Sequence, residues 1–329
     1  MTPPAADTRF LTTLPYTRRA AWTERADIAG ADGTPAPRVV ARLVRDAARY
    51  DALVLNGSVR RDQVAAVLVA RRRRRPVTVL VDATWKTAGD GARGRARRAA
   101  VRSLDHPDAH YCVLSEEEAR LFPANWAVPA ERVHVTPFHW VLDERTVEPV
   151  PEADGGVFAG GDSVRDYGPL FEAAAGLPAP VTIASRTPPP ERLPENVTLG
   201  PVEPARYDEL FRRASVVVVP LEARRDRSAG QQTYLNAMVL GKPVVVTEAT
   251  GVRDYIEHRQ TGLIVPPADA GAMRAALDWV LDPANALEVR ALGERARRAA
   301  LERFGPERYV ERLLDVVDLA LERHAAAGK

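Results

Sequence analysis

The residues best suited to bind an anion lie in segment 228–243. Small and amide side chains there precede an apolar run that ends at Gly241. The pattern predicts a helix over about residues 229–240, because the apolar spacing stops at the glycine. Free N–H groups and the helix dipole at its start would suit a diphosphate. Alternatively, Ser228 and Gln231 could form an ordinary capping box, which needs no ligand.

A second glycine-rich turn carries a cationic side chain. Gly160 and Gly161 follow a short apolar strand pattern and permit a ligand to approach the backbone closely. Arg165 lies in the turn before the next predicted helix, where its guanidinium could reach a diphosphate held by the helix described above. The alternative is a surface arginine whose neighbours Ser163 and Asp166 cap the helix.

Polar and aromatic side chains also follow the strand patterns of the first half. Asn56 and Gly57 follow one strand, Asp82 and Trp85 follow the next, and His139 comes after the last. We expect these residues on the acceptor side of a site. Asp82 could hold a sugar hydroxyl or a cationic acceptor, or could cap the turn that follows it. Trp85 could stack on an acceptor or pack in the core, and His139 could contact a ligand or pack at a hinge.

Metal and dinucleotide chemistry have less support in the sequence. The six histidines show no metal-binding spacing, and no Asp-x-Asp motif occurs. Residues 89–94 fit the pattern G-x-G-x-x-G, but residues 82–88 separate them from the preceding strand pattern. In dinucleotide folds the first glycine follows the strand directly. We therefore expect no metal and no bound cofactor.

Length and composition bound the class of protein. The chain has 329 residues, 46% of them hydrophobic and 27% charged, which suits two globular domains. No apolar run approaches the roughly 20 residues of a membrane span. The single cysteine, Cys112, and the lack of an apolar leader favour a cytoplasmic location.

The charge distribution is uneven along the chain. The 46 basic and 44 acidic residues give a net charge of +2, so we expect no nucleic-acid partner. The run from Arg71 to Arg75 and the arginines between Arg93 and Arg102 concentrate basic charge in the first half. They could contact a phosphorylated acceptor or a peripheral anionic membrane, or could form solvated faces.

Strand and helix patterns alternate through both halves. The alternation predicts two Rossmann-like α/β domains with parallel sheets that face a cleft, since helical crossovers join parallel strands. A proline- and glycine-rich stretch at 147–156 predicts a linker between domains 1–147 and 148–329, and the last helix could pack back on the first domain. The predicted strands are 52–55, 77–81, 111–114, 133–136, 157–159, 181–184, 197–199, 216–219 and 243–247.

Helical spacing completes this pattern. Ser115 and Glu118 predict a capping box that opens one helix. Residues 10–14 form a short apolar stretch to which no element is assigned. An arginine-rich helix is predicted between the glycine-rich loop at 89–94 and the strand at 111–114. The other predicted helices are 39–50, 63–71, 167–175, 206–213, 229–240, 270–281, 286–304 and 306–326.

The motifs of the second half occur in an order that resembles a known family. In chain order they are Phe-Ala-Gly160-Gly161, Leu199-Gly-Pro-Val, Val216-Val-Val-Val-Pro220, Ala237-Met-Val-Leu-Gly-Lys-Pro, Thr250-Gly-Val-Arg-Asp-Tyr-Ile and Thr261-Gly-Leu-Ile-Val-Pro-Pro-Ala-Asp269. From residue 157 to about 319 the chain resembles the donor-binding domain of GT-B glycosyltransferases. The resemblance is greatest to the retaining family 4, which includes sucrose, mannosyl and GlcNAc transferases.

The chain also departs from this family. The family's two glutamates, which contact the donor sugar and the ribose, correspond to Ser228 and Asn236. Asn236, about two turns along the same predicted helix, can bond the ribose through its amide, and Ser228 can offer a hydroxyl to the sugar. The arginine that follows the family's phosphate loop corresponds to Gly161, so Arg165 is the nearest replacement. A histidine common in the family corresponds to Asp82.

The resemblance implies a glycosyltransferase that moves a sugar from a nucleotide-diphosphate donor to a small-molecule or envelope-type acceptor. It implies retention of configuration, no divalent metal, and catalytic roles for Arg165 and Asp82. The implied donor-binding residues are Gly160, Gly161, Ser185, Arg186, Ser228, Ala229, Gly230, Gln231, Gln232 and Asn236. A catalytically silent GT-B partner or regulator is a second hypothesis, and an NAD-linked enzyme built on residues 89–94 is a third.

Overall fold

The computed structural model describes residues 8–30, 33–87, 89–148, 156–223 and 227–327. The chain divides into two compact units: Met1–Pro137 with Glu307–Lys329, and Phe138–Pro306. The domain boundary predicted at 147–148 falls inside the second unit, and the last predicted helix is grouped with the first unit from Glu307 onward. Most of the predicted linker, residues 149–155, lies outside the described residues.

The first unit contains a six-stranded sheet in the order β2-β1-β3-β4-β5-β6. All neighbouring strands pair in parallel, as the predicted alternation of strands and helices requires. The strands are β1 (Phe10–Thr12), β2 (Ala26–Ile28), β3 (Ala52–Asn56), β4 (Val77–Val81), β5 (Ala109–Val113) and β6 (Val133–Val135). The sequence did not predict β1 and β2, because three residues are too few to show a period and these strands depend on pairing with their neighbours.

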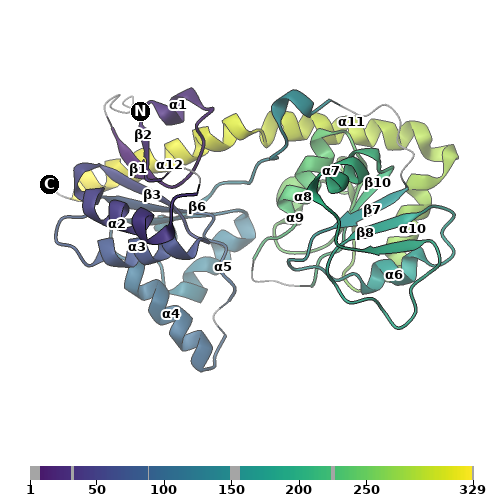
Figure 1. Ribbon diagram of the computed structural model, residues 1–329, viewed down its shortest axis with the longest axis horizontal. Coiled ribbons are helices and arrows are strands. Elements are labelled where there is room, and N and C mark those ends of the chain that lie inside the picture. The colour runs from purple at the N-terminus through teal and green to yellow at the C-terminus, as the bar shows by residue number, and fades with distance from the viewer. Residues whose placement is uncertain (1–7, 31–32, 88, 149–155, 224–226, 328–329) are drawn as a thin grey trace. The chain divides into compact units, whose positions relative to one another are not determined.

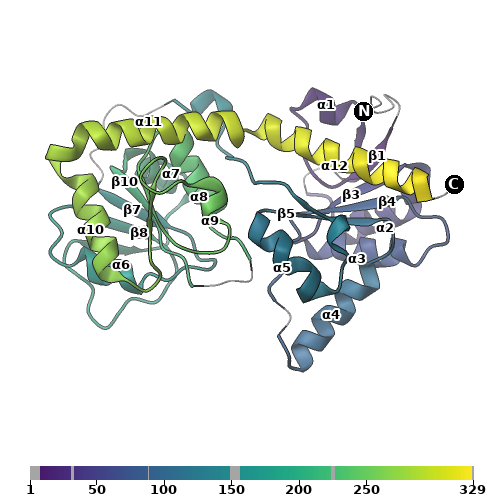
Figure 2. The ribbon, with the colours of Figure 1, turned by 180° about the vertical axis from the view of Figure 1, so that it is seen from behind.

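Helices cover this sheet on both faces. The helices are α1 (Ala20–Thr23), α2 (Ala36–Asp46), α3 (Arg60–Ala70), α4 (Ala92–Leu104), α5 (Glu116–Trp126) and α12 (Pro306–Ala327). Helices α2 to α5 contribute to one hydrophobic core, and α12 lies across the opposite face of the sheet from α2 and α3 (Figures 1 and 2). Arg25 holds α12 through hydrogen bonds from both terminal nitrogens to the carboxylate of Asp318. The predicted N-cap is confirmed, since Ser115 Oγ accepts from the N–H of Glu118 at 3.1 Å. In return, Glu118 Oε2 accepts from the N–H of Leu114 at 2.9 Å.

The second unit contains a parallel sheet in the order β12-β11-β10-β7-β8-β9. Its strands are β7 (Val157–Gly160), β8 (Val181–Ala184), β9 (Val197–Gly200), β10 (Val216–Val219), β11 (Val244–Thr247) and β12 (Leu263–Val265). Alternate valines of β10 enter different cores: Val217 and Val219 join one, and Val216 and Val218 join the other. Burial on both faces explains why this strand is a continuous apolar run.

The helices of the second unit lie on both sides of its sheet (Figure 1). They are α6 (Gly168–Ala174), α7 (Pro204–Arg213), α8 (Gln231–Val239), α9 (Val252–Tyr255), α10 (Ala270–Leu281) and α11 (Ala286–Arg303). Phe211 of α7 and Tyr234 of α8 belong to one core, whereas Leu170 of α6 and Leu277 of α10 belong to the other. Every residue of α8 from Tyr234 to Val239 is buried, so this helix is fixed firmly against the sheet.

Candidate functional site

The second unit has a switch point between the neighbouring strands β7 and β10. From β7 the chain proceeds to β8 and β9 on one side, and β10 is followed by β11 and β12 on the other. At such a point the connections that follow the two strands diverge, which favours a ligand site at the carboxyl edge of the sheet. An antiparallel bridge between Arg165 and Leu221 joins the two connections.

Helix α8 begins at this edge without a side-chain cap. Its N-cap is Gly230, which has a φ of +84° and is followed by a first turn that bonds to no capping side chain. A β-carbon at Gly230 would lie 2.9 Å from Val219 Cγ1, so both the backbone conformation and the space require glycine. The helix start therefore offers N–H groups and the positive end of the dipole to an anion.

Two expectations about this helix are wrong. The helix starts at Gln231 behind a glycine cap, so it does not open with a capping box from Ser228. Ser228 is buried three residues before the helix and thus does not share it with Asn236. Asn236 Oδ1 accepts a hydrogen bond from the N–H of Val141 at 2.9 Å. This bond orients the amide, and its Nδ2 group is the part that a ribose could meet.

The glycine turn after β7 is closely packed. A β-carbon at Gly160 would lie 2.5 Å from the hydroxyl of Tyr207. Gly161 has a φ of +106°, and its carbonyl accepts from the hydroxyl of Tyr167 at 2.6 Å. Both positions therefore need glycine for local reasons of packing and backbone conformation.

Arg165 connects this turn to α8. Its Nε donates to the carbonyl of Gly160 at 3.3 Å, and its terminal nitrogens donate to the carbonyl of Ser163 at 2.9 Å and to Thr233 Oγ1 at 3.1 Å. No carboxylate among the described residues forms an ion pair with it. Burial lowers the pKa of the guanidinium, which still remains charged at neutral pH. Arg165 is thus a half-buried cation held by neutral oxygens and not a freely solvated side chain.

Asp162 joins the loops that follow β7 and β8, a role that the sequence analysis missed. Its Oδ1 accepts from Ser185 Oγ and from the N–H of Arg186, each at 2.8 Å. Hydrogen bonding from the Arg186 N–H and then from Ser185 lowers the pKa of this carboxyl. Ser185 is buried, while the side chain of Arg186 is largely exposed and lies 3.7 Å from Asp162.

The remaining predicted donor-site residues differ in burial. Ala229 is partly buried against the core, Gln231 is buried and Gln232 is exposed. The Nε2 atom of Gln231 has no hydrogen-bond partner among the described residues. Arg227 was not predicted, yet its Nη2 atom donates to Ser163 Oγ at 3.3 Å. The sequence signal that could have indicated Arg227 was its position directly before Ser228, a predicted donor-site residue.

In the first unit, Trp85 is partly buried and packs against the hydrophobic core. Its ring packs against Phe122 and Trp126 with centroids 5.5 and 5.4 Å away. Its Nε1 donates to the carbonyl of Gly57 at 2.7 Å, which ties the loop after β3 to the loop after β4. The Oδ1 atom of Asn56 accepts from the N–H of Ser58 at 2.9 Å. This geometry favours core packing for Trp85 over a stacking wall.

Asp82 terminates β4 in a left-handed conformation with φ +55°. Its Oδ1 accepts from the hydroxyl of Tyr309 on α12 at 2.9 Å, and its carbonyl accepts from Ser58 Oγ at 2.7 Å. Burial raises the pKa of this carboxyl to about 6, although the Tyr309 hydrogen bond acts in the opposite direction. A strained residue with a raised pKa at the carboxyl edge of a parallel sheet is a candidate functional group.

His139 belongs to the second unit, which starts at Phe138. It is buried, its Nδ1 lies 2.6 Å from the carbonyl oxygen of Trp140, and its ring stacks on that of Phe138 at 5.0 Å. These contacts favour the packing role over an acceptor contact.

The described residues contain no group of three or more His, Cys, Asp or Glu side chains that could hold a metal ion. None of the helices formed by the described residues is both long enough and apolar enough to cross a membrane. Strand β4 ends at Val81 and α4 begins at Ala92, so residues 89–94 do not form the direct strand-to-helix turn of a dinucleotide site. The arginines of α4 form no ion pairs with described residues, and membrane contact through them stays a prediction.

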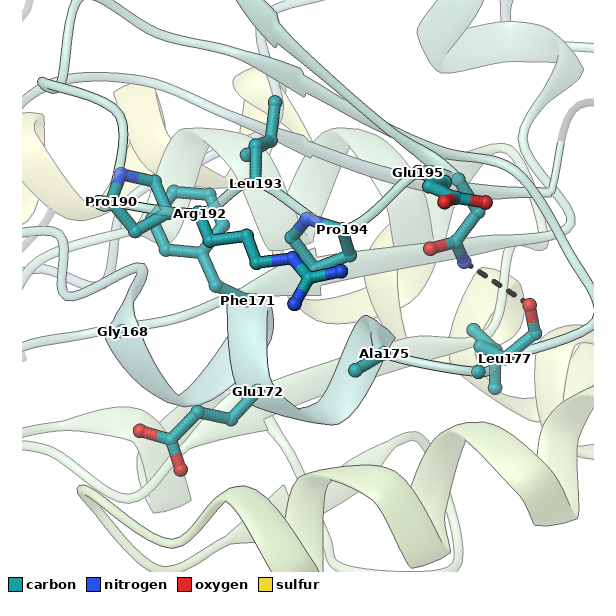
Figure 3. A pocket seen from close by; sticks show the side chains of 12 residues that line it. Gly168, Phe171, Glu172, Ala175, Leu177, Pro190, Arg192, Leu193, Pro194 and Glu195 are labelled. Atoms are coloured by element: carbon teal, nitrogen blue, oxygen red, sulfur yellow. Dashed lines mark hydrogen bonds between the residues drawn. The ribbon is translucent and has the colours of Figure 1, made fainter.

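A surface cavity of about 680 Å³ lies elsewhere in the second unit. It is bounded by α6 and the segment before β9, with Phe171, Leu193 and Pro194 on its walls and Arg192 beside them (Figure 3). None of the predicted site residues lines this cavity, so its size alone does not connect it to the switch point.

Comparisons with known proteins support the resemblance to GT-B glycosyltransferases. Residues 178–283 match the family described as "Glycosyl transferases group 1", and a comparison with curated proteins finds no match. Sucrose-phosphate synthase from Thermosynechococcus elongatus is 19% identical, with a TM-score of 0.66 over 89% of this chain and 78% of that one. HepE from Anabaena, in complex with UDP-glucose, is 15% identical, with a TM-score of 0.62 over 93% of this chain and 87% of that one.

A glycosyltransferase from Rickettsia africae is 11% identical, with a TM-score of 0.64 over 95% of this chain and 90% of that one. These likenesses show the GT-B fold, which the sequence predicted, with two six-stranded parallel sheets flanked by helices. The family match within the second unit, together with this fold, supports a glycosyltransferase.

The raised pKa of Asp82 predicts a pH-dependent contribution to stability. In the folded protein the Asp82 carboxyl keeps its proton up to about pH 6, whereas the ordinary pKa of an aspartate is 3.8. The contribution of this protonation to the free energy of unfolding is therefore complete below pH 3.8 and is lost as the pH rises through 6. Relative to Asp82→Asn, we expect the wild-type free energy of unfolding to fall by about 1 to 3 kcal/mol between pH 4 and pH 7. Urea titrations across this range would measure the difference. A constant difference between the two proteins would contradict the assignment.

Proposed function

We propose that the protein transfers a sugar from a nucleotide-diphosphate donor to a small-molecule or envelope-type acceptor, with retention of anomeric configuration and without a divalent metal. The observation that carries the proposal is the convergence at one switch point of the glycine turn, Arg165 and the uncapped start of α8. The sequence around this point also lies partly within the matched glycosyltransferase region. UDP is the nucleotide to test first, because HepE was solved with UDP-glucose.

In this proposal, the diphosphate of the donor lies between the glycine turn and the start of α8. The N–H groups of α8 and the guanidinium of Arg165 stabilise the negative charge that grows on the leaving diphosphate. Since this charge is larger in the transition state than in the bound substrate, the interaction accelerates transfer and does not merely tighten binding. A retaining transfer of this kind needs no separate general base.

The other donor contacts follow from the same placement. Ser185 and Arg186, which Asp162 holds at the end of β8, lie where they could contact the nucleoside. The amide of Asn236 would meet the ribose through Nδ2, since Oδ1 already binds the backbone of Val141. Ser228 would offer a hydroxyl to the sugar.

A thermal-shift panel of UDP, GDP, dTDP and NAD tests the proposal against its rivals. A nucleoside diphosphate at about 100 times its Kd should stabilise the protein by about 2.7 kcal/mol, because only the folded state binds it. A stabilisation by NAD alone would favour an NAD-linked enzyme. No stabilisation by any of the four would favour a silent GT-B protein.

Removal of Arg165 should impair catalysis more than folding. We expect Arg165→Ala to lower turnover at saturating donor by roughly 100-fold, the scale for one preorganised electrostatic donor. Arg165→Lys should restore only part of the rate, because a point charge lacks the bidentate fork. Arg206→Ala is the matched control, as this arginine of α7 is exposed and pairs with Glu209. Near-normal turnover of Arg165→Ala would show that the diphosphate binds elsewhere.

Activity should survive chelation. The described residues present no metal-binding cluster, and the chain lacks an Asp-x-Asp motif. We therefore expect an unchanged rate after dialysis against EDTA, measured by release of the nucleoside diphosphate. Loss of turnover in EDTA and its recovery with Mg²⁺ or Mn²⁺ would contradict the metal-independent scheme.

A further inference from the structure

Among the described residues, the carboxyl group of Asp82 has no positively charged partner. Tyr309 from α12 donates to Oδ1, and no described residue forms a hydrogen bond with Oδ2. No arginine, lysine or histidine of the described chain forms an ion pair with this carboxylate. Taken as a whole residue, Asp82 is partly buried.

The groups around Asp82 are neutral at pH 7 on each neighbouring element. Tyr309 is fully buried on α12, and the ring of Tyr16, from the loop after β1, packs edge-on against it at 5.8 Å. Cys112 on β5 is buried, and burial and Asp82 both raise the pKa of its thiol. Ser58 Oγ, from the loop after β3, donates to the backbone carbonyl of Asp82 and lies 3.2 Å from Thr84 Oγ1. The site therefore holds one ionisable carboxyl among phenols, a thiol and a hydroxyl.

This environment does not require a carboxylate for structural reasons. With a pKa of about 6, Asp82 is mostly ionised at pH 7.5, and burying that charge without a cation costs free energy. An asparagine would accept the same hydrogen bond from Tyr309 without this cost. The carboxylate is thus explained by a ligand that brings the missing positive charge.

We propose that Oδ2 of Asp82 binds the ammonium group of the acceptor, which is therefore an amino sugar or another small polyol that carries an amine. The inference rests on the proposed function, because it takes Asp82 as an acceptor-side residue. Tyr309 acts as a positioning residue: its hydroxyl occupies Oδ1 and leaves Oδ2 for the ligand. A carboxylate next to an ammonium group gives a charge-assisted hydrogen bond, which a neutral hydroxyl cannot match.

The test is calorimetry of the full chain, saturated with UDP, against glucosamine, N-acetylglucosamine and glucose at pH 7.5. We expect glucosamine to bind at least tenfold more tightly than the other two, because only it carries an ammonium group. Asp82→Asn should abolish this preference, whereas Asp51→Asn, an exposed carboxylate that precedes β3 at the opposite edge of the sheet, should retain it.

A pH series separates a direct role from a structural one. The preference for glucosamine should weaken below pH 6 as Asp82 takes up its proton. Tyr309→Phe should move the midpoint of this change to higher pH, since the hydrogen bond from Tyr309 lowers the pKa of Asp82. A general loss of folding would not produce such a shift.

The outcomes distinguish this inference from the proposed function. Equal binding of the three sugars, no binding of glucosamine, or a preference that survives Asp82→Asn would overturn the role of Asp82 in amine binding. If UDP still stabilises the same preparations, the proposed function stands. If no nucleoside diphosphate binds, the proposed function fails even where the amine preference is present.

Discussion

The hydrogen bond from Arg165 to Thr233 connects the two parts of the candidate donor site, the turn after β7 and the start of α8. Arg165 comes from the turn after β7, and Thr233 lies in the first turn of α8, which follows β10. The guanidinium also binds the carbonyls of Gly160 and Ser163, so three of its five donors are engaged by neutral oxygens. Its charge is not cancelled by a described carboxylate. The arrangement fixes a cation in place and leaves its field available to an anionic ligand.

The packing of the second unit makes this arrangement rigid. The valines of β10 fill two cores, one on each face of the sheet, and the buried residues 234–239 of α8 fasten that helix to it. Strand ends anchored in this way vary little in position, so the loops they carry can hold a charged group accurately. Glycine at positions 160, 161 and 230 is required by local packing or by backbone conformation.

The sequence predicted elements with strong local signals. Helix α10 spans Ala270–Leu281 as predicted, and Ser115 caps α5 as its spacing with Glu118 indicated. Two features needed tertiary information. Strand β1 is three residues long and exists through pairing, and Tyr309 meets Asp82 although 227 positions separate them in the chain. No local pattern reports such a contact, so the environment of Asp82 could not be derived from the sequence.

The central claim is that Arg165 faces the diphosphate of the donor, and calorimetry with UDP and UMP tests it most directly. The wild-type protein should bind UDP more tightly than UMP, because only UDP places a second phosphate at the guanidinium. Arg165→Ala should reduce this UDP-to-UMP affinity ratio by about tenfold or more, which corresponds to about 1.4 kcal/mol of lost interaction. An affinity ratio that is the same in both proteins would contradict the account.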